Sequence, residues 1–205
     1  MKSILIVFAK TPILGSVKSR LADKLGDIKT LWVYKQLLKK TKIAIQSIQQ
    51  NVVVYYLGDR TDFFDQLFLN CEKHPQEGID LGERMANAIS TEFEKGFNQI
   101  IIIGTDMWDL NQENIEKAFK VLNNSDIVIG PASDGGYYLL GIKKMIPDIF
   151  QNKKWGSQTV LKETLKDLKN YKVSFLKEKN DIDLLEDLKK HPNLLNKLKH
   201  HFNEK

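Results

Sequence analysis

The sequence predicts one α/β domain with a mainly parallel central sheet and helices on both faces. Short runs rich in β-branched residues alternate along the chain with longer segments of helical periodicity, as in successive βαβ units. One of these runs, residues 99–103, is almost entirely isoleucine, which is typical of a strand buried on both faces. No repeat or Gly/Ser-rich linker divides the 205 residues, so we expect a single domain over residues 1–205.

The individual elements follow from the period of the apolar positions. Apolar alternation or continuous β-branched runs predict strands at residues 3–9, 52–57, 99–103, 126–129, 137–142 and 172–176. Helical spacing predicts helices at residues 17–25, 31–49, 62–69, 80–95, 111–122 and 157–168, with mostly helix after residue 176.

Composition excludes several classes of protein. With 42% hydrophobic and 28% charged residues the chain lies in the globular range, and no apolar run approaches the roughly 20 residues that a membrane-spanning helix needs. The single cysteine, Cys71, excludes an internal disulfide and a cysteine-rich metal site, which fits a reducing cytoplasm. The net charge of +5 does not predict a nucleic-acid partner, because the lysines of residues 162–169 alternate with acids as on a solvated helix face.

The loop after the first strand combines a flexible turn with basic residues. Gly15 permits a positive φ, and Ser16 is a reasonable N-cap for the helix that follows. Lys10, Lys18 and Arg20 add three cations, which suit a phosphate chain. No Walker pattern is present, so an ordinary capped surface helix with basic decoration stays open.

An aspartate follows the buried isoleucine strand. Mg²⁺ and Mn²⁺ prefer oxygen ligands, and they usually take one or two carboxylates together with nucleotide phosphates. Asp106 is placed for this role at the end of the strand. Alternatively, Asp106 or Asp109 caps the helix that begins near residue 111. Asp109 fits the cap better, so we expect Asp106 to be the metal ligand.

The sequence Asp134-Gly135-Gly136 lies between two predicted strands. Taken alone, it favours a hairpin turn. The paired glycines would also leave room for a substrate against bare backbone, with Asp134 binding hydroxyls or acting as a base.

Two further acidic segments have both a structural and a functional interpretation. Asp80 and Glu83 have the spacing of a capping box, and Arg84 beside them reaches either a phosphate or a neighbouring acid. Asp183 is either a second metal carboxylate or the N-cap of the following helix.

In chain order these segments resemble the radical-SAM/selenodomain-associated transferase 1 family, within the nucleotide-diphospho-sugar transferase superfamily. The resemblance reaches to about residue 188 and leaves residues 189–205 as a helical C-terminal extension. Departures occur at Met107-Trp108, where the family has a small residue and proline, at Gly156, and at Leu184-Leu185. The matching segments are residues 8–21, 80–85, 103–106 and 130–141, with weaker matches at 155–161 and 181–188.

The resemblance implies a GT-A-like, Rossmann-related three-layer sandwich, a nucleotide-activated donor and a divalent metal, Mg²⁺ or Mn²⁺. Asp106 and Asp134 would be the catalytic residues, and Asp106 and Asp183 would bind the metal. The nucleotide and its phosphates would lie against Lys10, Gly15, Lys18, Arg20 and Arg84. The sugar or acceptor pocket would be lined by Gly135, Gly136, Tyr137 and Trp155.

Three functions are compatible with this site. The first is a metal-dependent glycosyltransferase that uses a nucleotide-diphosphate sugar and a small-molecule acceptor. The second is a nucleotidylyltransferase acting on a nucleoside triphosphate, since residues 18–21 also resemble the equivalent loop of 2-phospholactate guanylyltransferases. The third is a nucleotide- or RNA-binding module without turnover, for which Met107-Trp108 is the main argument.

Overall fold

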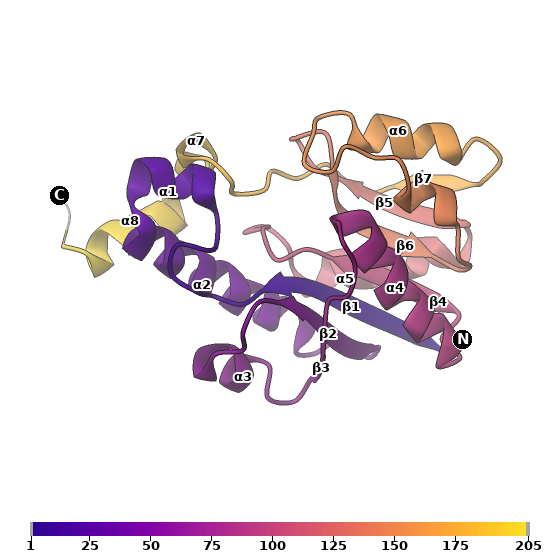
Figure 1. The fold of residues 1–205 in the computed structure, drawn as a ribbon, viewed down its shortest axis with the longest axis horizontal. Helices are drawn as coiled ribbons and strands as arrows, with labels where there is room; N and C mark the ends of the chain where they lie inside the picture. The colour runs from indigo at the N-terminus through magenta and orange to yellow at the C-terminus, as the bar shows by residue number, and fades with distance from the viewer. Residues whose placement is uncertain (1, 204–205) are drawn as a thin grey trace.

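Over residues 2–203, which the computed structural model describes, a seven-stranded sheet forms the middle layer of the protein (Figure 1). Its order is β3-β2-β1-β4-β6-β5-β7. All neighbouring pairs are parallel except those that involve β6, which runs antiparallel to β4 and β5. The strands are β1 (Ser3–Lys10), β2 (Asn51–Leu57), β3 (Glu72–Pro75), β4 (Gln99–Ile103), β5 (Ile127–Pro131), β6 (Tyr137–Ile142) and β7 (Val173–Phe175).

Helices cover both faces of this sheet. On one face lie α1 (Ser19–Leu25), α2 (Asp27–Ile45), α3 (Asp62–Leu67), α5 (Gln112–Asn123), α7 (Leu185–Lys189) and α8 (Pro192–His201). On the other lie α4 (Leu81–Glu94), the 3-10 helix η1 (Pro147–Phe150) and α6 (Val160–Asp167). The predicted three-layer α/β sandwich is therefore confirmed (Figure 1).

The central strands owe their burial to side chains that alternate between two cores. In β1, Leu5 and Val7 point into the core under α2 and α5, whereas Ile4 and Ile6 point into the core under α4. The predicted buried strand is confirmed in β4, where Ile100–Ile103 are at most 4% exposed.

The structure also corrects several local predictions. The strand β3 was not expected, because its sequence carries no apolar pattern; it is a short edge strand paired only with β2. Ser16 is not an N-cap: α1 begins at Ser19, with Lys18 in the capping position, and Ser16 Oγ donates to the Ile13 carbonyl instead. The cap of α5 is Asn111 rather than Asp109.

The C-terminal helices pack beside the first two helices. Within the expected extension, α8 contacts α2, and the Trp32 indole stacks on the His201 ring with centroids 5.1 Å apart. Residues 204–205 of that extension lie outside the described residues. Between residues 2 and 203 no helix has the length and apolar character to cross a membrane.

The topology gathers the loops of interest at one edge of the sheet. The strands β1, β4 and β5 are parallel in direction and end at this edge, and antiparallel β6 begins there. The β5–β6 connection is a hairpin turn, as its Asp-Gly-Gly sequence favours. Ligands of open α/β sheets bind at this edge, so the sheet places the predicted site residues where a ligand would lie.

Candidate functional site

A cleft of about 550 Å³ opens at the carboxyl edge of the sheet. Its walls come from the ends of β1 and β4, the start of β6, the first turns of α1 and α4, and the segment that follows β7. Of the predicted site residues, those lining the cleft are Lys10, Lys18, Arg20, Arg84, Asp106, Asp134, Gly136, Tyr137, Trp155 and Asp183.

The ammonium group of Lys18 lies between two carboxylates in this cleft. Its Nζ is 2.7 Å from Oδ1 of Asp106 and 3.7 Å from Oδ1 of Asp183. The Lys18 side chain is only 6% exposed, whereas Asp106 is 46% exposed. The guanidinium of Arg20 approaches the same pair, with Nη1 3.1 Å from Oδ2 of Asp183. Two of the predicted phosphate-binding cations, Lys18 and Arg20, therefore converge on the two predicted metal ligands.

The backbone of Lys18 has an uncommon conformation. Its φ of 53° and ψ of 48° are left-handed, which costs a non-glycine residue about 1–2 kcal/mol. Lys18 precedes the first turn of α1 and Arg20 lies within it, so the two side chains reach one carboxylate although they are not on one helix face.

Asp183 is brought to Asp106 by the extended segment between β7 and α7, which crosses the edge of the sheet (Figure 1). The amide of Ile182 donates to the carbonyl oxygen of Asp106 at 3.1 Å, and Lys179 pairs with Ala132 as an isolated bridge. Asp183 is not an N-cap, because Leu184 occupies the capping position of α7.

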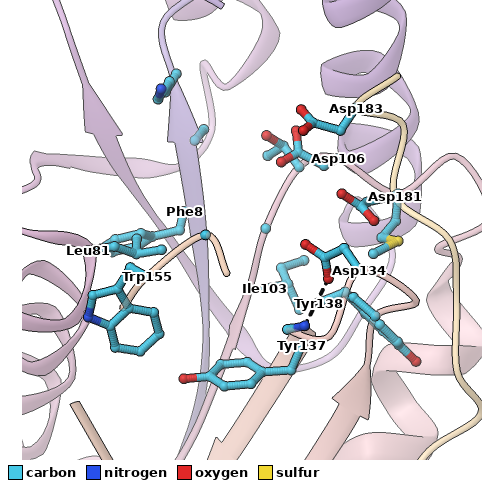
Figure 2. A pocket seen from close by; sticks show the side chains of 18 of the residues that line it. Phe8, Leu81, Ile103, Asp106, Asp134, Tyr137, Tyr138, Trp155, Asp181 and Asp183 are labelled. Atoms are coloured by element: carbon cyan, nitrogen blue, oxygen red, sulfur yellow. Dashed lines mark hydrogen bonds between the residues drawn. The ribbon is translucent and has the colours of Figure 1, made fainter. Parts of the chain in front are cut away.

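Four aspartates lie along one side of the cleft: Asp106, Asp183, Asp181 and Asp134 (Figure 2). Burial, reinforced by the negative charge of Asp134, raises the pKa of Asp181 to about 6. Lys18 partly offsets this rise. The negative charge on this wall exceeds what Lys18 neutralises, so an additional cation would be stabilised here.

Asp134 is oriented by the hairpin that carries it. Its Oδ1 accepts a hydrogen bond from the amide of Gly136 at 2.9 Å. Gly135, in the same hairpin, does not line the cleft; its φ is 89°, and a Cβ atom there would overlap the backbone of Gln158. Its carbonyl accepts from the amide of Leu161 at 2.9 Å, which fixes the hairpin to the start of α6.

The wall opposite the aspartates is apolar and aromatic, formed by Phe8, Leu81, Tyr137 and Trp155 (Figure 2). The rings of Tyr137 and Trp155 meet edge to face, with centroids 6.5 Å apart. Trp155 also closes against Gly82 of α4, where any side chain would overlap the indole. The cleft thus offers an apolar, aromatic surface across from a charged one (Figure 2).

Buried hydrogen bonds support the floor of the site. The Tyr34 hydroxyl bonds both the amide and the carbonyl of Lys10, and lies 3.3 Å from the Thr105 hydroxyl. Burial, with the charge of Asp106 adding to it, raises the pKa of Tyr34, so its hydroxyl stays protonated at neutral pH. Tyr34 thereby connects the ends of β1 and β4.

Gly15 lies outside the predicted site, whereas Arg84 lies in it with a partner that was not expected. Gly15 is outside the cleft lining; its φ of 75° serves the 13–16 turn, closed by a bond from the Ser16 amide to the Ile13 carbonyl. Arg84 lines the cleft, and its Nε donates to the Gly78 carbonyl at 3.0 Å rather than to an acid. The Asp80 cap is present, since its Oδ1 accepts from the Glu83 amide.

Asp106 and Asp183 are the side chains of the cleft that could hold a divalent metal. Among residues 2–203 no group of three or more His, Cys, Asp and Glu side chains is arranged to hold an ion. Asp106 and Asp183, however, already share one cation, the Lys18 ammonium, and both supply the hard oxygen donors that Mg²⁺ and Mn²⁺ prefer. The pair would fit such an ion if Lys18 moved aside and phosphate or water oxygens completed the coordination.

Sequence reasoning missed Asp181 and the tyrosine beneath the site. A signal for Asp181 was present, because side chains alternate along an extended segment and Ile182 is fully buried. Asp181 and Asp183, which flank Ile182, are therefore expected together on the other side of this segment. Tyr34 gave no such signal, since its spacing in α2 is that of an ordinary core residue.

The chain is similar to proteins described as transferases. A crystal structure from Desulfovibrio desulfuricans G20, provisionally described as a nucleotide-diphospho-sugar transferase, matches with a TM-score of 0.86 at 30% identity. That match covers 97% of this chain and 87% of the other. The 2-phospho-L-lactate guanylyltransferase of Methanocaldococcus vulcanius is 27% identical over 144 residues, which are 68% of this chain and 61% of that enzyme. The match thus spans about three fifths of the guanylyltransferase.

The chain is more distantly similar in structure to a protein in complex with manganese. The crystal structure of Rv0371C from Mycobacterium tuberculosis H37Rv with manganese matches at a TM-score of 0.56 and 13% identity, covering 93% of this chain and 97% of that one. At this identity the likeness shows the fold alone. A family described as "Uncharacterized protein conserved in bacteria (DUF2064)" matches residues 40–157, more than half of the chain. The chain therefore belongs to this bacterial family, DUF2064, and has the fold of nucleotide-diphospho-sugar transferases.

Proposed function

We propose that this protein is a metal-dependent glycosyltransferase that takes a sugar from a nucleotide-diphosphate donor. The observation that carries the proposal is the convergence of Lys18 and Arg20 with Asp106 and Asp183 in one cleft. Cations for a diphosphate and carboxylates for a divalent metal are the two requirements of such a donor site. The 30% identical relative described as a nucleotide-diphospho-sugar transferase supports this choice, as does the narrower resemblance to the radical-SAM/selenodomain-associated transferases.

In this proposal some residues of the cleft bind the metal and others bind the phosphates. Asp106 and Asp183 hold the divalent metal, Mg²⁺ or Mn²⁺. The bound metal would neutralise the charge that develops on the departing diphosphate. Lys18 and Arg20, turned toward the phosphate oxygens, add to that neutralisation.

In this proposal the acceptor binds against the β5–β6 hairpin and the apolar wall of the cleft. Asp134, held by the Gly136 amide, is placed to accept the proton of an acceptor hydroxyl. The faces of Tyr137 and Trp155 provide an apolar surface for a sugar ring or a base and exclude water from it. Arg84 and Lys10, on the rim of the cleft, extend its positive charge toward the nucleotide.

A second candidate is nucleotidyl transfer from a nucleoside triphosphate. The similarity to 2-phospho-L-lactate guanylyltransferase favours it, and the same Lys18 and Arg20 would then hold a triphosphate. A phosphorylated acceptor would attack the α-phosphate, and pyrophosphate would leave. The departure Met107-Trp108 does not argue against either enzyme, because Trp108 lies outside the cleft lining and only Met107 contributes to it.

A thermal-shift panel of nucleotide sugars and of nucleoside di- and triphosphates, each with and without Mn²⁺, tests these candidates. At a hundredfold excess over its dissociation constant, a ligand that binds only the folded state adds about 2.7 kcal/mol of stability. A shift with one nucleotide sugar that grows with Mn²⁺ would support glycosyl transfer. A shift confined to a triphosphate, with pyrophosphate released on adding acceptor, would support the second candidate. No shift with any nucleotide would reject both.

A further inference from the structure

Two cations of the cleft that would bind phosphate, Lys18 and Arg20, are paired with carboxylates that would bind the metal. Lys18 contacts Asp106 and Asp183 at 2.7 and 3.7 Å, and Arg20 contacts Asp183 at 3.1 Å. The Lys18 ammonium therefore lies where the oxygen atoms of both carboxylates can share one positive ion. A divalent metal bound to the same two carboxylates would need the same place.

We infer that the Lys18 ammonium and the divalent metal compete for Asp106 and Asp183, and that a polyphosphate resolves this competition by drawing Lys18 away. The polyphosphate half of the inference rests on the proposed function. It names a role for Lys18 beyond phosphate binding: Lys18 makes entry of the metal depend on the nucleotide.

The physical reason is the cost of leaving a buried charge without a partner. The Lys18 side chain is 6% exposed. If the metal alone displaced it, the ammonium would lose both carboxylates with little water to replace them. If a phosphate alone attracted Lys18, Asp106 and Asp183 would remain beside Asp181 and Asp134, in an already negative wall. When both ligands bind, every charge exchanges one partner for another.

The backbone of Lys18 strengthens this competition. A left-handed φ of 53° at a residue other than glycine is unfavourable and is kept only where the surroundings enforce it. The two ion pairs are interactions that offset this cost. Lys18 is thus held by contacts that a ligand can replace. Because such coupling is reciprocal, the metal must raise nucleotide affinity by the same factor.

The test uses Mn²⁺ alone, with free Mn²⁺ followed by electron paramagnetic resonance during a titration. K18Q removes the competing ammonium, and K10Q is the matched control, since Lys10 lines the same cleft and no ion pair between Lys10 and the aspartates is present among the described residues. We expect K18Q to bind Mn²⁺ at least tenfold more tightly than the wild type, and K10Q to change affinity by less than threefold. Equal effects of the two substitutions, or no gain in K18Q, would overturn the inference.

A measurement on the wild type guards against misfolding of K18Q. Acetylation of each lysine, quantified by mass spectrometry, reports how accessible its ammonium is. Mn²⁺ at saturating concentration should raise the reactivity of Lys18 several-fold and leave that of Lys10 unchanged. Unchanged Lys18 reactivity at a Mn²⁺ concentration that binds would contradict the competition. Failure of the proposed function would give a different result. In that case neither the wild type nor K18Q would respond to any nucleoside di- or triphosphate, whatever the effect of K18Q on Mn²⁺ affinity.

Discussion

The Tyr34 hydroxyl accepts a hydrogen bond from the Lys10 amide at 3.0 Å and donates one to the carbonyl of the same residue at 2.9 Å. One side chain of α2 thus fixes the point where β1 enters the cleft. Because Tyr34 is 3% exposed, water cannot replace these bonds if the hydroxyl is removed.

Tyr34→Phe should therefore destabilise the fold by about 1–3 kcal/mol, the cost of leaving buried polar groups unpaired. For a domain of this size each kcal/mol lowers the melting temperature by about 2–4 °C. Thr105→Val is the matched control, because the Thr105 hydroxyl makes only the longer 3.3 Å contact. A larger loss in Thr105→Val than in Tyr34→Phe, measured by urea unfolding, would show that the network is assigned wrongly.

Asp106→Asn should remove the Mn²⁺-dependent part of any nucleotide-induced thermal shift, because an amide is a much weaker ligand for a hard cation than a carboxylate. The control is Asp109→Asn, three residues further along. Asp109 lies outside the cleft lining, and its Oδ1 is 3.5 Å from Nδ1 of His191. We expect the control to keep the full Mn²⁺ response. If Asp106→Asn keeps it as well, Asp106 is not a metal ligand.

Gly135→Ala should destabilise the protein for two separable reasons. Its φ of 89° disfavours any side chain, and a Cβ atom would overlap the Gln158 backbone. Gly96→Ala isolates the first reason, since Gly96 has φ of 85° with nothing near its Cβ position. We expect a loss of roughly 1 kcal/mol for Gly96→Ala and clearly more for Gly135→Ala in urea unfolding. Equal losses would mean that the hairpin moves freely away from α6.

Asp187 anchors the segment that carries Asp181 and Asp183. Its carboxylate accepts hydrogen bonds from the Leu184 amide at 2.9 Å, the Asp183 amide at 3.3 Å and the Asn180 side chain at 3.1 Å. Burial opposes ionisation, but these bonds and Lys190 outweigh it and lower the pKa of Asp187.

A lowered pKa in the folded state stabilises the protein above the ordinary aspartate value of about 4, and this contribution is lost as the pH falls through the folded pKa. Asp187→Asn should consequently cost about 1 kcal/mol at pH 7, and the gap to the wild type should narrow as the pH falls below the ordinary aspartate pKa of about 4. Chemical unfolding at pH 7 and pH 3 measures both. A gap that is independent of pH would assign the loss to packing rather than to charge.

The sequence predicted the layers well because burial leaves a periodic trace. The isoleucines of β4 and the adjacent apolar residues Leu5 and Ile6 of β1 indicate strands with a hydrophobic core on each face. The strand β3 left no trace, because an exposed edge strand such as Glu72–Pro75 buries no apolar side. The helix cap predicted at Ser16 was wrong, because the hydroxyl donates to the Ile13 carbonyl within the local 13–16 turn.

The site was predictable as a set of residues but not as a set of contacts. Asp106 was predicted from its place after the buried strand, Asp134 from the Asp-Gly-Gly sequence and Asp183 from its acidic segment, and the structure places all three in one cleft. That Lys18 would be paired with Asp106 depends on the left-handed backbone at position 18 and on the Ile182–Asp106 hydrogen bond. Neither has a local sequence signature.

The reversed direction of β6 has a consequence for how such a protein can change. In an all-parallel sheet each strand places only its carboxyl end at the edge where ligands bind. The chain must then return to the opposite edge before the next strand can contribute a residue. Here the chain turns back at once, so the loop between β5 and β6 can be lengthened or shortened without altering the pairing of β1, β2 and β4. The hairpin that carries Asp134 can therefore change in length while the part of the edge that carries Asp106 stays fixed.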